Sequence, residues 1–196
     1  MVIGLTGAIG SGKSTVARFF GENGFHIVDC DAISHEINGD ERYVAEIKAA
    51  FGEEYVKNGE ADRAALAETV FANKDALRKL TAISHKFILQ IVCERAECAV
   101  SEGKDVIIDA PLLFESELNK KCDVTVCVVA GKENRLERAL GRGGITRDNI
   151  IARMNNQPPS EFYSQRCDFV LKNDGSVAEL KAETEKLIGF LKRASR

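Results

Sequence analysis

Eight consecutive residues near the start of the chain have the types and spacing of a phosphate-binding loop (P-loop). The motif G-x-x-x-x-G-K-[ST] is matched at every fixed position by Gly7-Ala8-Ile9-Gly10-Ser11-Gly12-Lys13-Ser14. Glycines let such a loop bring its backbone N–H groups close to a phosphate. The alternative is a glycine-rich turn without a ligand. A predicted strand before the motif and a predicted helix after it favour binding of a nucleoside triphosphate.

The side chains of this loop can be given roles from their chemistry. The backbone of Gly10–Gly12 would surround the phosphates, and Lys13 would place a positive charge on the β- and γ-phosphates. The Ser14 hydroxyl can bind Mg²⁺, and Thr15 can add a hydroxyl to the α-phosphate. A nucleoside triphosphate and Mg²⁺ are therefore the expected ligands of this loop.

Acidic residues stand at the ends of two predicted strands. Asp29 and Asp31 come at the end of a strand predicted at 26–29, and Asp109 comes near the end of one predicted at 105–110. In an open parallel sheet the carboxyl ends of the strands face the ligand, so Asp31 can accept the proton of an attacking hydroxyl. Alternatively, Asp31 caps the helix that follows, and the role of Asp29 stays open. Asp109 is a candidate to hold Mg²⁺ through water.

Strands and helices must position these residues, and the sequence pattern of the chain is typical of an α/β fold. Short apolar runs alternate with helical stretches, which is typical of a parallel sheet. Strands are predicted at 2–6, 26–29, 105–110, 124–129 and 169–172. Helices are predicted at 14–23, 43–51, 62–71, 75–102 (one long helix or two), 133–140, 146–157, 160–166 and 177–194. From Asp31 to about Gly103 we expect helices and no strand: a helical subdomain that forms a substrate pocket or lid, or a plain cover.

Composition narrows the class of protein. The chain has 196 residues, of which 44% are hydrophobic and 29% charged, as in a soluble single-domain protein. A formal net charge of −3 argues against a dedicated nucleic-acid binder. There is no long apolar run, and Met1-Val2-Ile3 is not a basic leader, so we expect a cytoplasmic protein without a membrane partner. No obligatory protein partner is expected.

Several motifs together resemble the dephospho-CoA kinase family. The P-loop alone is generic, but its combination with Asp29-Cys30-Asp31 and Pro111-Leu112-Leu113-Phe114-Glu115 is specific. The resemblance covers almost the whole chain and includes Phe71-Ala72-Asn73, His85, Arg138, Arg142, Gln157 and the stretch 167–175. It implies a P-loop three-layer sandwich with a five-stranded parallel sheet, a helical substrate subdomain and a short helical lid. The core would be 1–31 and 104–196, the subdomain about 32–103, and the lid region about 138–167.

The resemblance also implies an activity. Enzymes of this family use MgATP to phosphorylate the ribose 3′-hydroxyl of dephospho-CoA, the last step of coenzyme A synthesis. Carried over to this sequence, Asp31 is the base for that hydroxyl, and Lys13 stabilises the transferred group. Arg138 and Arg142 close over the ATP phosphates, unless they form only a solvated basic face.

Further residues are expected on the substrate side. Thr6, Glu115 and His85 are candidates for substrate binding, although a histidine on an apolar helix is often a packing residue. Asn173 and Gly175 either border the adenine pocket or form a simple turn.

Departures from the family pattern keep other functions open. Ala8 replaces a frequent glycine, Cys30 replaces an alanine, and Lys86 replaces a proline after His85, which weakens the case for a role of that histidine.

One alternative function is that of another small-molecule P-loop kinase with a nucleoside monophosphate or sugar-acid acceptor. The other is a non-catalytic ATP-binding regulatory module.

Overall fold

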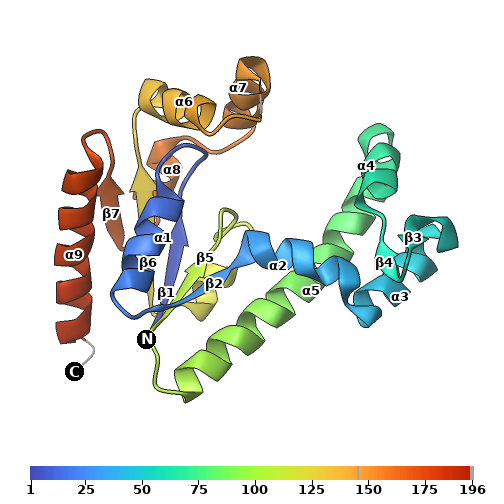
Figure 1. Ribbon diagram of the computed structural model, residues 1–196, viewed down its shortest axis with the longest axis horizontal. Helices are drawn as coiled ribbons and strands as arrows, with labels where there is room; N and C mark the ends of the chain where they lie inside the picture. Colours follow the sequence, from blue (N-terminus) through green and yellow to red (C-terminus); the bar gives the residue numbers. More distant parts are fainter. Residues whose placement is uncertain (145, 195–196) are drawn as a thin grey trace. The chain divides into compact units, whose positions relative to one another are not determined.

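The structure is a computed structural model that describes residues 1–144 and 146–194, leaving out the side chain of Ala72. Its contacts divide the chain into two compact units (Figure 1). The sheet unit consists of Met1–Val28 and Ala96–Arg196, and the helical unit is Asp29–Arg95.

The sheet unit is built on a five-stranded parallel sheet with the strand order β2-β5-β1-β6-β7. The strands are β1 (Val2–Thr6), β2 (His26–Asp29), β5 (Val106–Asp109), β6 (Val124–Val129) and β7 (Phe169–Lys172). Apolar residues fill both faces of the central strands, as expected for a sheet covered on two sides. The predicted α/β fold with five parallel strands is confirmed.

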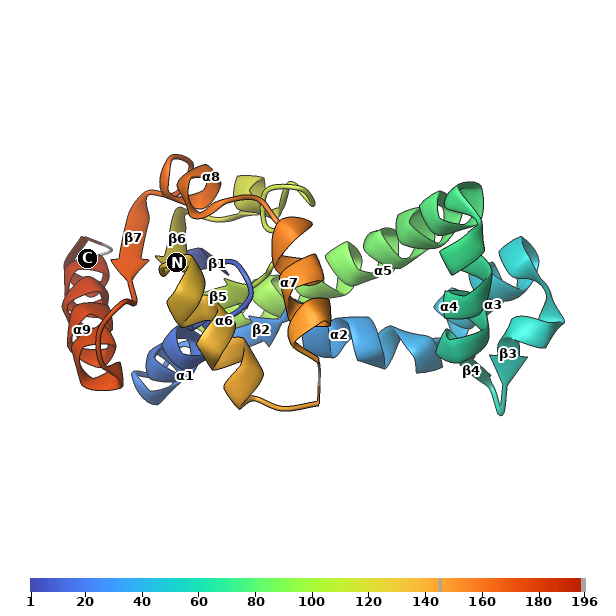
Figure 2. The ribbon, with the colours of Figure 1, turned by 90° about the horizontal axis from the view of Figure 1, so that it is seen from above.

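Helices cover both faces of this sheet (Figure 2). On one face, α1 (Lys13–Glu22) and α9 (Val177–Ala194) enclose the main core with alternate residues of the central strands. On the other, α8 (Ser160–Ser164) packs against β6, where Tyr163, Cys127 and Ala8 form a second core. Neighbouring residues of β6 point to opposite faces, so Val126 and Val128 belong to the first core and Cys127 to the second.

Two further helices lie between β6 and α8 in the sequence. They are α6 (Lys132–Gly141) and α7 (Arg147–Asn155), and Thr146 caps α7 by accepting the N–H of Asn149 at 3.4 Å. A short 3₁₀ helix, η3 (Leu118–Lys121), precedes β6. The lid region expected at about 138–167 includes residue 145, which lies outside the described residues.

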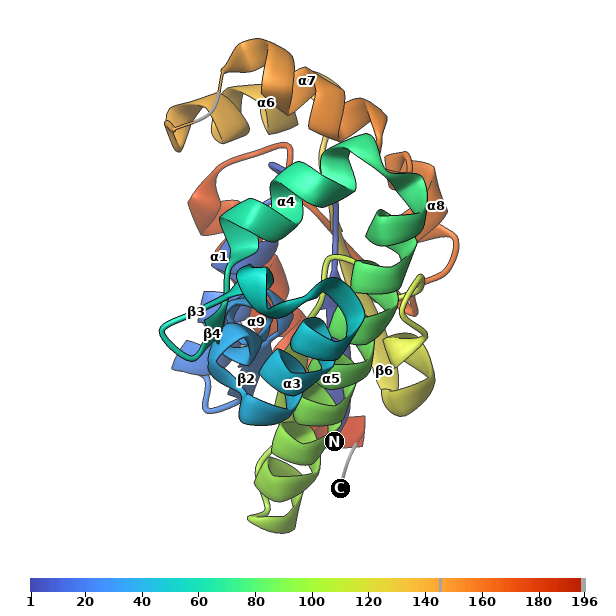
Figure 3. The ribbon, with the colours of Figure 1, turned by 90° about the vertical axis from the view of Figure 1, so that its right-hand side faces the viewer.

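The helical unit is formed around the first part of α5 (Lys74–Ser101), whose last residues belong to the sheet unit (Figure 3). Against it pack α3 (Glu41–Phe51) and α4 (Arg63–Ala72), and the rings of Tyr43 and Phe87 meet edge to face at 5.5 Å. The other helices are α2 (Cys30–Glu36), η1 (Ile37–Gly39) and η2 (Glu53–Tyr55). In the described part of the chain, no helix is long and apolar enough to span a bilayer.

One prediction for this unit is wrong, because it contains a small hairpin. The strands β3 (Val56–Lys57) and β4 (Glu60–Ala61) pair in antiparallel register. They are joined by Asn58 and Gly59, whose φ angles are 53° and 84°. Two successive residues with positive φ make the type of tight turn that joins short antiparallel strands.

Candidate active site

The loop between β1 and α1 has a backbone that glycine adopts most easily. Gly10 and Gly12 have φ angles of 76° and 101°, where an L side chain is strained. Space is also lacking: a Cβ on Gly10 would lie 2.1 Å from the carbonyl oxygen of Arg135, and one on Gly12 would lie 2.2 Å from Nδ2 of Asn173. The two glycines therefore let the loop pack directly against two later segments of the chain.

Two side chains from the C-terminal half hold the backbone of this loop. Gln157 accepts a hydrogen bond from the N–H of Ile9 at 2.8 Å, and Asn173 donates one to the carbonyl of Ser11 at 2.7 Å. Asn173 is buried, and its own N–H donates to the carbonyl of Val129 at 2.8 Å. The side chain of Asn173 thus braces the loop, while its expected place beside adenine stays a prediction.

The charged group of the loop is paired. Lys13 Nζ donates to a carboxylate oxygen of Asp109, and the two side chains are only 13% and 7% exposed. Leu5 stands opposite Asp109 in the sheet, so this carboxylate lies beside the strand that leads into the loop. Buried charges need a partner, and each of these groups balances the other. A phosphate that binds Lys13 must therefore compete with Asp109 for the ammonium group.

Two hydroxyl groups stand in the first turn of α1. Ser14 is exposed and Thr15 is half-buried. The first turn of a helix leaves backbone N–H groups without intrahelical partners, which favours an anion at this end. The Ser14 hydroxyl and the Asp109 carboxylate are both oxygen donors, the ligands that Mg²⁺ prefers, so these residues fit the expected metal.

The two arginines expected in the lid lie at the C-terminal end of α6. Arg138 is half-buried and donates through Nη1 to the carbonyl of Asn173 at 2.7 Å. Arg142 is exposed and forms the C-cap of α6. Residues four positions apart lie on one face of a helix, so Arg138 and the C-cap Arg142 share a face at this end of α6. The first is linked through Asn173 to the braced loop.

Three other expected residues of the sheet unit differ in their surroundings. Thr6 is fully buried, and its hydroxyl donates to the carbonyl of Pro111 at 3.4 Å. Glu115 is exposed; burial and the charge of Glu115 raise the pKa of Tyr163 to about 12. Gly175 is exposed just before α9. Their proposed contacts with substrate or nucleotide stay predictions.

In the helical unit, the two neighbouring aspartates have different roles. Asp29 is the N-cap of α2, since its Oδ1 accepts the N–H groups of Asp31 at 2.8 Å and Ala32 at 3.1 Å. The alternative that Asp31 caps this helix is therefore wrong, because the helix begins one residue earlier, at Cys30. Asp31 is exposed, and within the described residues its carboxylate has no hydrogen-bond or ionic partner. It is the carboxylate available for chemistry.

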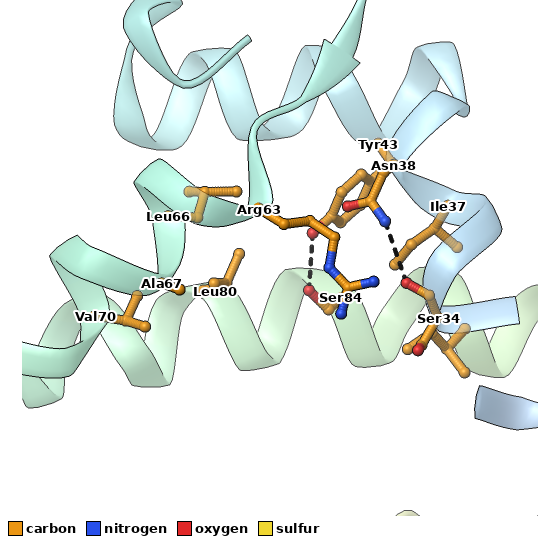
Figure 4. Close-up of a pocket in the computed structure, with 11 residues that line it drawn as sticks. Ser34, Ile37, Asn38, Tyr43, Arg63, Leu66, Ala67, Val70, Leu80 and Ser84 are labelled. Atoms are coloured by element: carbon orange, nitrogen blue, oxygen red, sulfur yellow. Dashed lines mark hydrogen bonds between the residues drawn. The ribbon is translucent and has the colours of Figure 1, made fainter. Parts of the chain in front are cut away.

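The helical unit also contains a cavity of about 310 Å³ (Figure 4). Its lining is largely apolar, with Leu66, Val70 and Leu80 on one side. Tyr43 and Ser84 contribute hydroxyl groups that hydrogen-bond to each other at 3.0 Å. Residues from α2, η1, α3, α4 and α5 meet here, so the sequence predicted a pocket in this subdomain as one alternative but not the residues that line it. His85 does not line it and is half-buried on α5.

Arg63 places a positive charge at the edge of this cavity. Its Nη1 lies 2.5 Å from Nδ1 of His35. A guanidinium group can only donate, so Nδ1 must accept and the proton of the neutral imidazole is assigned to Nε2. Arg63 was not among the residues expected from the sequence, because a single arginine at a helix start carries no signal of its own.

A parallel sheet whose first strand leads into a P-loop with a paired lysine defines a P-loop nucleoside triphosphate-binding protein. The family model for dephospho-CoA kinase matches residues 1–179. The chain therefore belongs to the dephospho-CoA kinase family, and it is an enzyme, an ATP-using phosphotransferase.

Relatives from bacteria agree with this assignment. The dephospho-CoA kinase of Latilactobacillus sakei is 35% identical over 188 residues, which are 95% of this chain and 93% of the relative. The dephospho-CoA kinase of Deinococcus radiodurans is 39% identical over 184 residues, 93% of this chain and 88% of the relative.

Solved structures have the same fold. A crystal structure from Thermus thermophilus aligns with a TM-score of 0.80 and 34% identity, covering 97% of each chain. Dephospho-CoA kinase from Campylobacter jejuni aligns with a TM-score of 0.76 and 26% identity, covering 100% of this chain and 98% of that one. Shikimate kinase from Bacteroides thetaiotaomicron, at 17% identity and a TM-score of 0.55, shares the fold alone.

Proposed function

We propose that this chain transfers the γ-phosphoryl group of ATP to the ribose 3′-hydroxyl of dephospho-CoA, giving coenzyme A and ADP. The observation that carries this proposal is the braced P-loop with Lys13 paired to Asp109, in a chain that belongs to the dephospho-CoA kinase family. This would be the last step of coenzyme A synthesis.

The reaction assigns a separate task to each charged group. The 3′-oxygen attacks the γ-phosphorus, the bond from that phosphorus to the bridging oxygen of ADP breaks, and the hydroxyl proton passes to Asp31. Lys13 leaves Asp109 and stabilises the phosphates, and Arg138 and Arg142 offset the charge that develops on the transferred group. The exposed carboxylate of Asp31 supports its role as the base.

We further propose that Ser14 and Asp109 hold Mg²⁺, the latter through water. The ion supplies charge neutralisation at the β- and γ-phosphates. The ammonium group of Lys13 lies at Asp109, so exchange of one cation for another at this carboxylate would accompany nucleotide binding. Calorimetric titration of ATP with and without Mg²⁺ tests the metal site directly: Ser14→Ala should reduce the gain in affinity that Mg²⁺ provides.

The cavity of the helical unit is the proposed site for the acceptor. Its apolar lining suits the pantetheine arm, and Arg63 at its edge suits a phosphate of the same molecule. Thr6, His85 and Glu115 remain proposed substrate contacts, and Asn173 with Gly175 the proposed border of the adenine pocket.

The lid is proposed to close when both substrates are bound, which would exclude water from the transferred phosphoryl group. Gly143 and Gly144, with φ angles of 69° and 78°, provide a turn after Arg142 that could act as a hinge. Protease cleavage near Gly143 should slow when ATP and dephospho-CoA are added together. Unchanged cleavage would count against closure.

The decisive experiment measures ADP release with MgATP and each of dephospho-CoA, adenosine, AMP, UMP and gluconate. Release with dephospho-CoA alone, with a product of the mass of coenzyme A, supports the proposal. Release only with another acceptor would keep the kinase class and overturn the proposed role of every substrate-side residue named above.

We also propose a cytoplasmic location, without nucleic-acid, membrane or obligatory protein partners.

A further inference from the structure

Arg135 of α6 is an arginine buried beside the P-loop. Arg135 is only 7% exposed, and its Nε and Nη1 atoms are buried and have no hydrogen-bond partner in the part of the chain that the structure describes. Among the described residues it also has no ion pair. A buried, unpaired charge costs stability, so such a residue calls for a functional reason.

The surroundings of Arg135 place it next to the anion-binding part of the loop. Its carbonyl oxygen packs so closely on Gly10 that a Cβ there would lie 2.1 Å away. Burial and the charge of Glu115 raise the pKa of Tyr163, and the positive charge of Arg135 opposes them with a smaller, lowering effect. Tyr163 in turn packs in one core with Ala8 of the same loop. The positive charge of Arg135 is therefore no more than one arginine side chain away from the α6 backbone that contacts the loop. It also lies near Tyr163, which packs against the loop.

We propose that Arg135 strengthens nucleotide binding through its charge, which acts on the phosphates across the P-loop without touching them. A positive charge that is shielded from water by protein acts over a longer distance than an exposed one, because water and salt screen it less. Arg135 would thus add to the positive potential that Lys13 and the loop N–H groups provide. The inference rests on the proposed binding of ATP and not on the identity of the acceptor, so it holds even if the acceptor is a molecule other than dephospho-CoA.

Arg135→Met tests this proposal because methionine keeps much of the apolar volume and removes the charge. Calorimetry should show about a tenfold weaker Kd for ATP, a smaller loss for ADP, and no change beyond twofold for adenosine. The thermal midpoint should rise, by about 2–4 °C, since an unpaired buried charge is removed. Binding weakens while the fold becomes more stable, and a merely structural arginine would give the opposite change in stability.

Two further variants make the result specific. Lys132→Met removes an exposed charge from the first turn of the same helix and should change the ATP Kd by less than twofold. Arg135→Gln, which is polar but uncharged, should weaken ATP binding as methionine does. The proposal is overturned if Arg135→Met lowers the thermal midpoint or does not fold. It is also overturned if the variants weaken ATP and adenosine equally, or if ATP binding is unchanged.

Discussion

Asp29 and Asp31 show how two identical side chains, two positions apart, acquire different roles. The carboxylate of Asp29 accepts two backbone N–H groups at the start of α2, while the carboxylate of Asp31 takes no part in capping this helix. A capping carboxylate is occupied and cannot take a proton without weakening the helix. Of these two aspartates, Asp31 is therefore the one that we propose as the base.

Asp31→Asn should lower kcat by about 10²–10⁴-fold, the usual contribution of a general base, while leaving the Kd for ATP within twofold. Single-turnover kinetics and calorimetry would measure the two quantities. The matched control is Asp29→Ser, which preserves a capping oxygen and should change kcat only a few-fold. Equal losses in the two variants would remove the distinction between cap and base.

Asp109→Asn should have opposite effects on two quantities: it should strengthen the binding of ATP without metal and weaken the use of Mg²⁺. Without metal, the variant should bind ATP about three- to tenfold more tightly, because Lys13 is released and a negative charge near the phosphates is removed. With metal, it should need more Mg²⁺ to reach half-maximal turnover.

Titration of the Asp109→Asn variant with ATP in the presence of EDTA would measure the metal-free affinity. Titration with Mg²⁺ in the ADP-release assay would measure the metal requirement. Asp105→Asn is the control, since Asp105 precedes the same strand at its other end and pairs with the N-terminal ammonium at 2.9 Å. It should leave both quantities unchanged. Weaker metal-free binding of ATP by Asp109→Asn would contradict the competition between Asp109 and phosphate for Lys13.

At the scale of elements, the P-loop is shaped by residues far away in the sequence. Gln157 and Asn173 hold its backbone from segments that follow α7 and β7. The backbone N–H of Asn173 also donates to β6, and its backbone carbonyl accepts a hydrogen bond from Arg138. A single residue, through its side chain and its backbone, therefore joins the strand, the loop and the helix of the expected lid.

Asn173→Ala should destabilise the protein by about 1–3 kcal/mol, because the carbonyl of Ser11 loses its donor in a buried place. The same change should weaken ATP binding, since the loop loses its brace. Chemical denaturation and calorimetry provide the measurements. The control is Asn155→Ala on the exposed side of α7, which should be close to neutral. A stable Asn173→Ala protein would show that the carbonyl finds another donor.

The same scale shows what the sequence could and could not indicate. The five strands and the P-loop follow from local patterns, an apolar run or a fixed spacing, and they were predicted correctly. The contacts of Asn173, Gln157 and Arg135 with the loop depend on how distant segments pack, which no local pattern encodes. The β3–β4 hairpin was missed although Asn58-Gly59 is a strong turn signal, because strands of two residues carry no apolar run.

For the whole molecule, the division of tasks between the two units can be tested with one ligand at a time. ATP should slow hydrogen exchange of backbone amides in the P-loop and the start of α1. Dephospho-CoA should slow it in α4 and the first half of α5, where the cavity lies. Mass spectrometry of peptides would measure both, with AMP as the control ligand. Protection by dephospho-CoA confined to the sheet unit would refute the proposed acceptor site.

The helical unit is one unbroken stretch of the chain, from Asp29 to Arg95, whereas the sheet unit is made from the two stretches on either side of it. If the proposed function holds, the cavity residues that distinguish one acceptor from another, together with the base Asp31, are encoded in a single continuous segment of the gene, and of the proposed substrate contacts only Thr6 and Glu115 lie outside it. One recombination event with two crossovers can then exchange the acceptor-reading segment while the ATP-reading machinery is inherited intact. New substrate ranges can arise in this lineage by transplantation of a segment as well as by the slow accumulation of point changes.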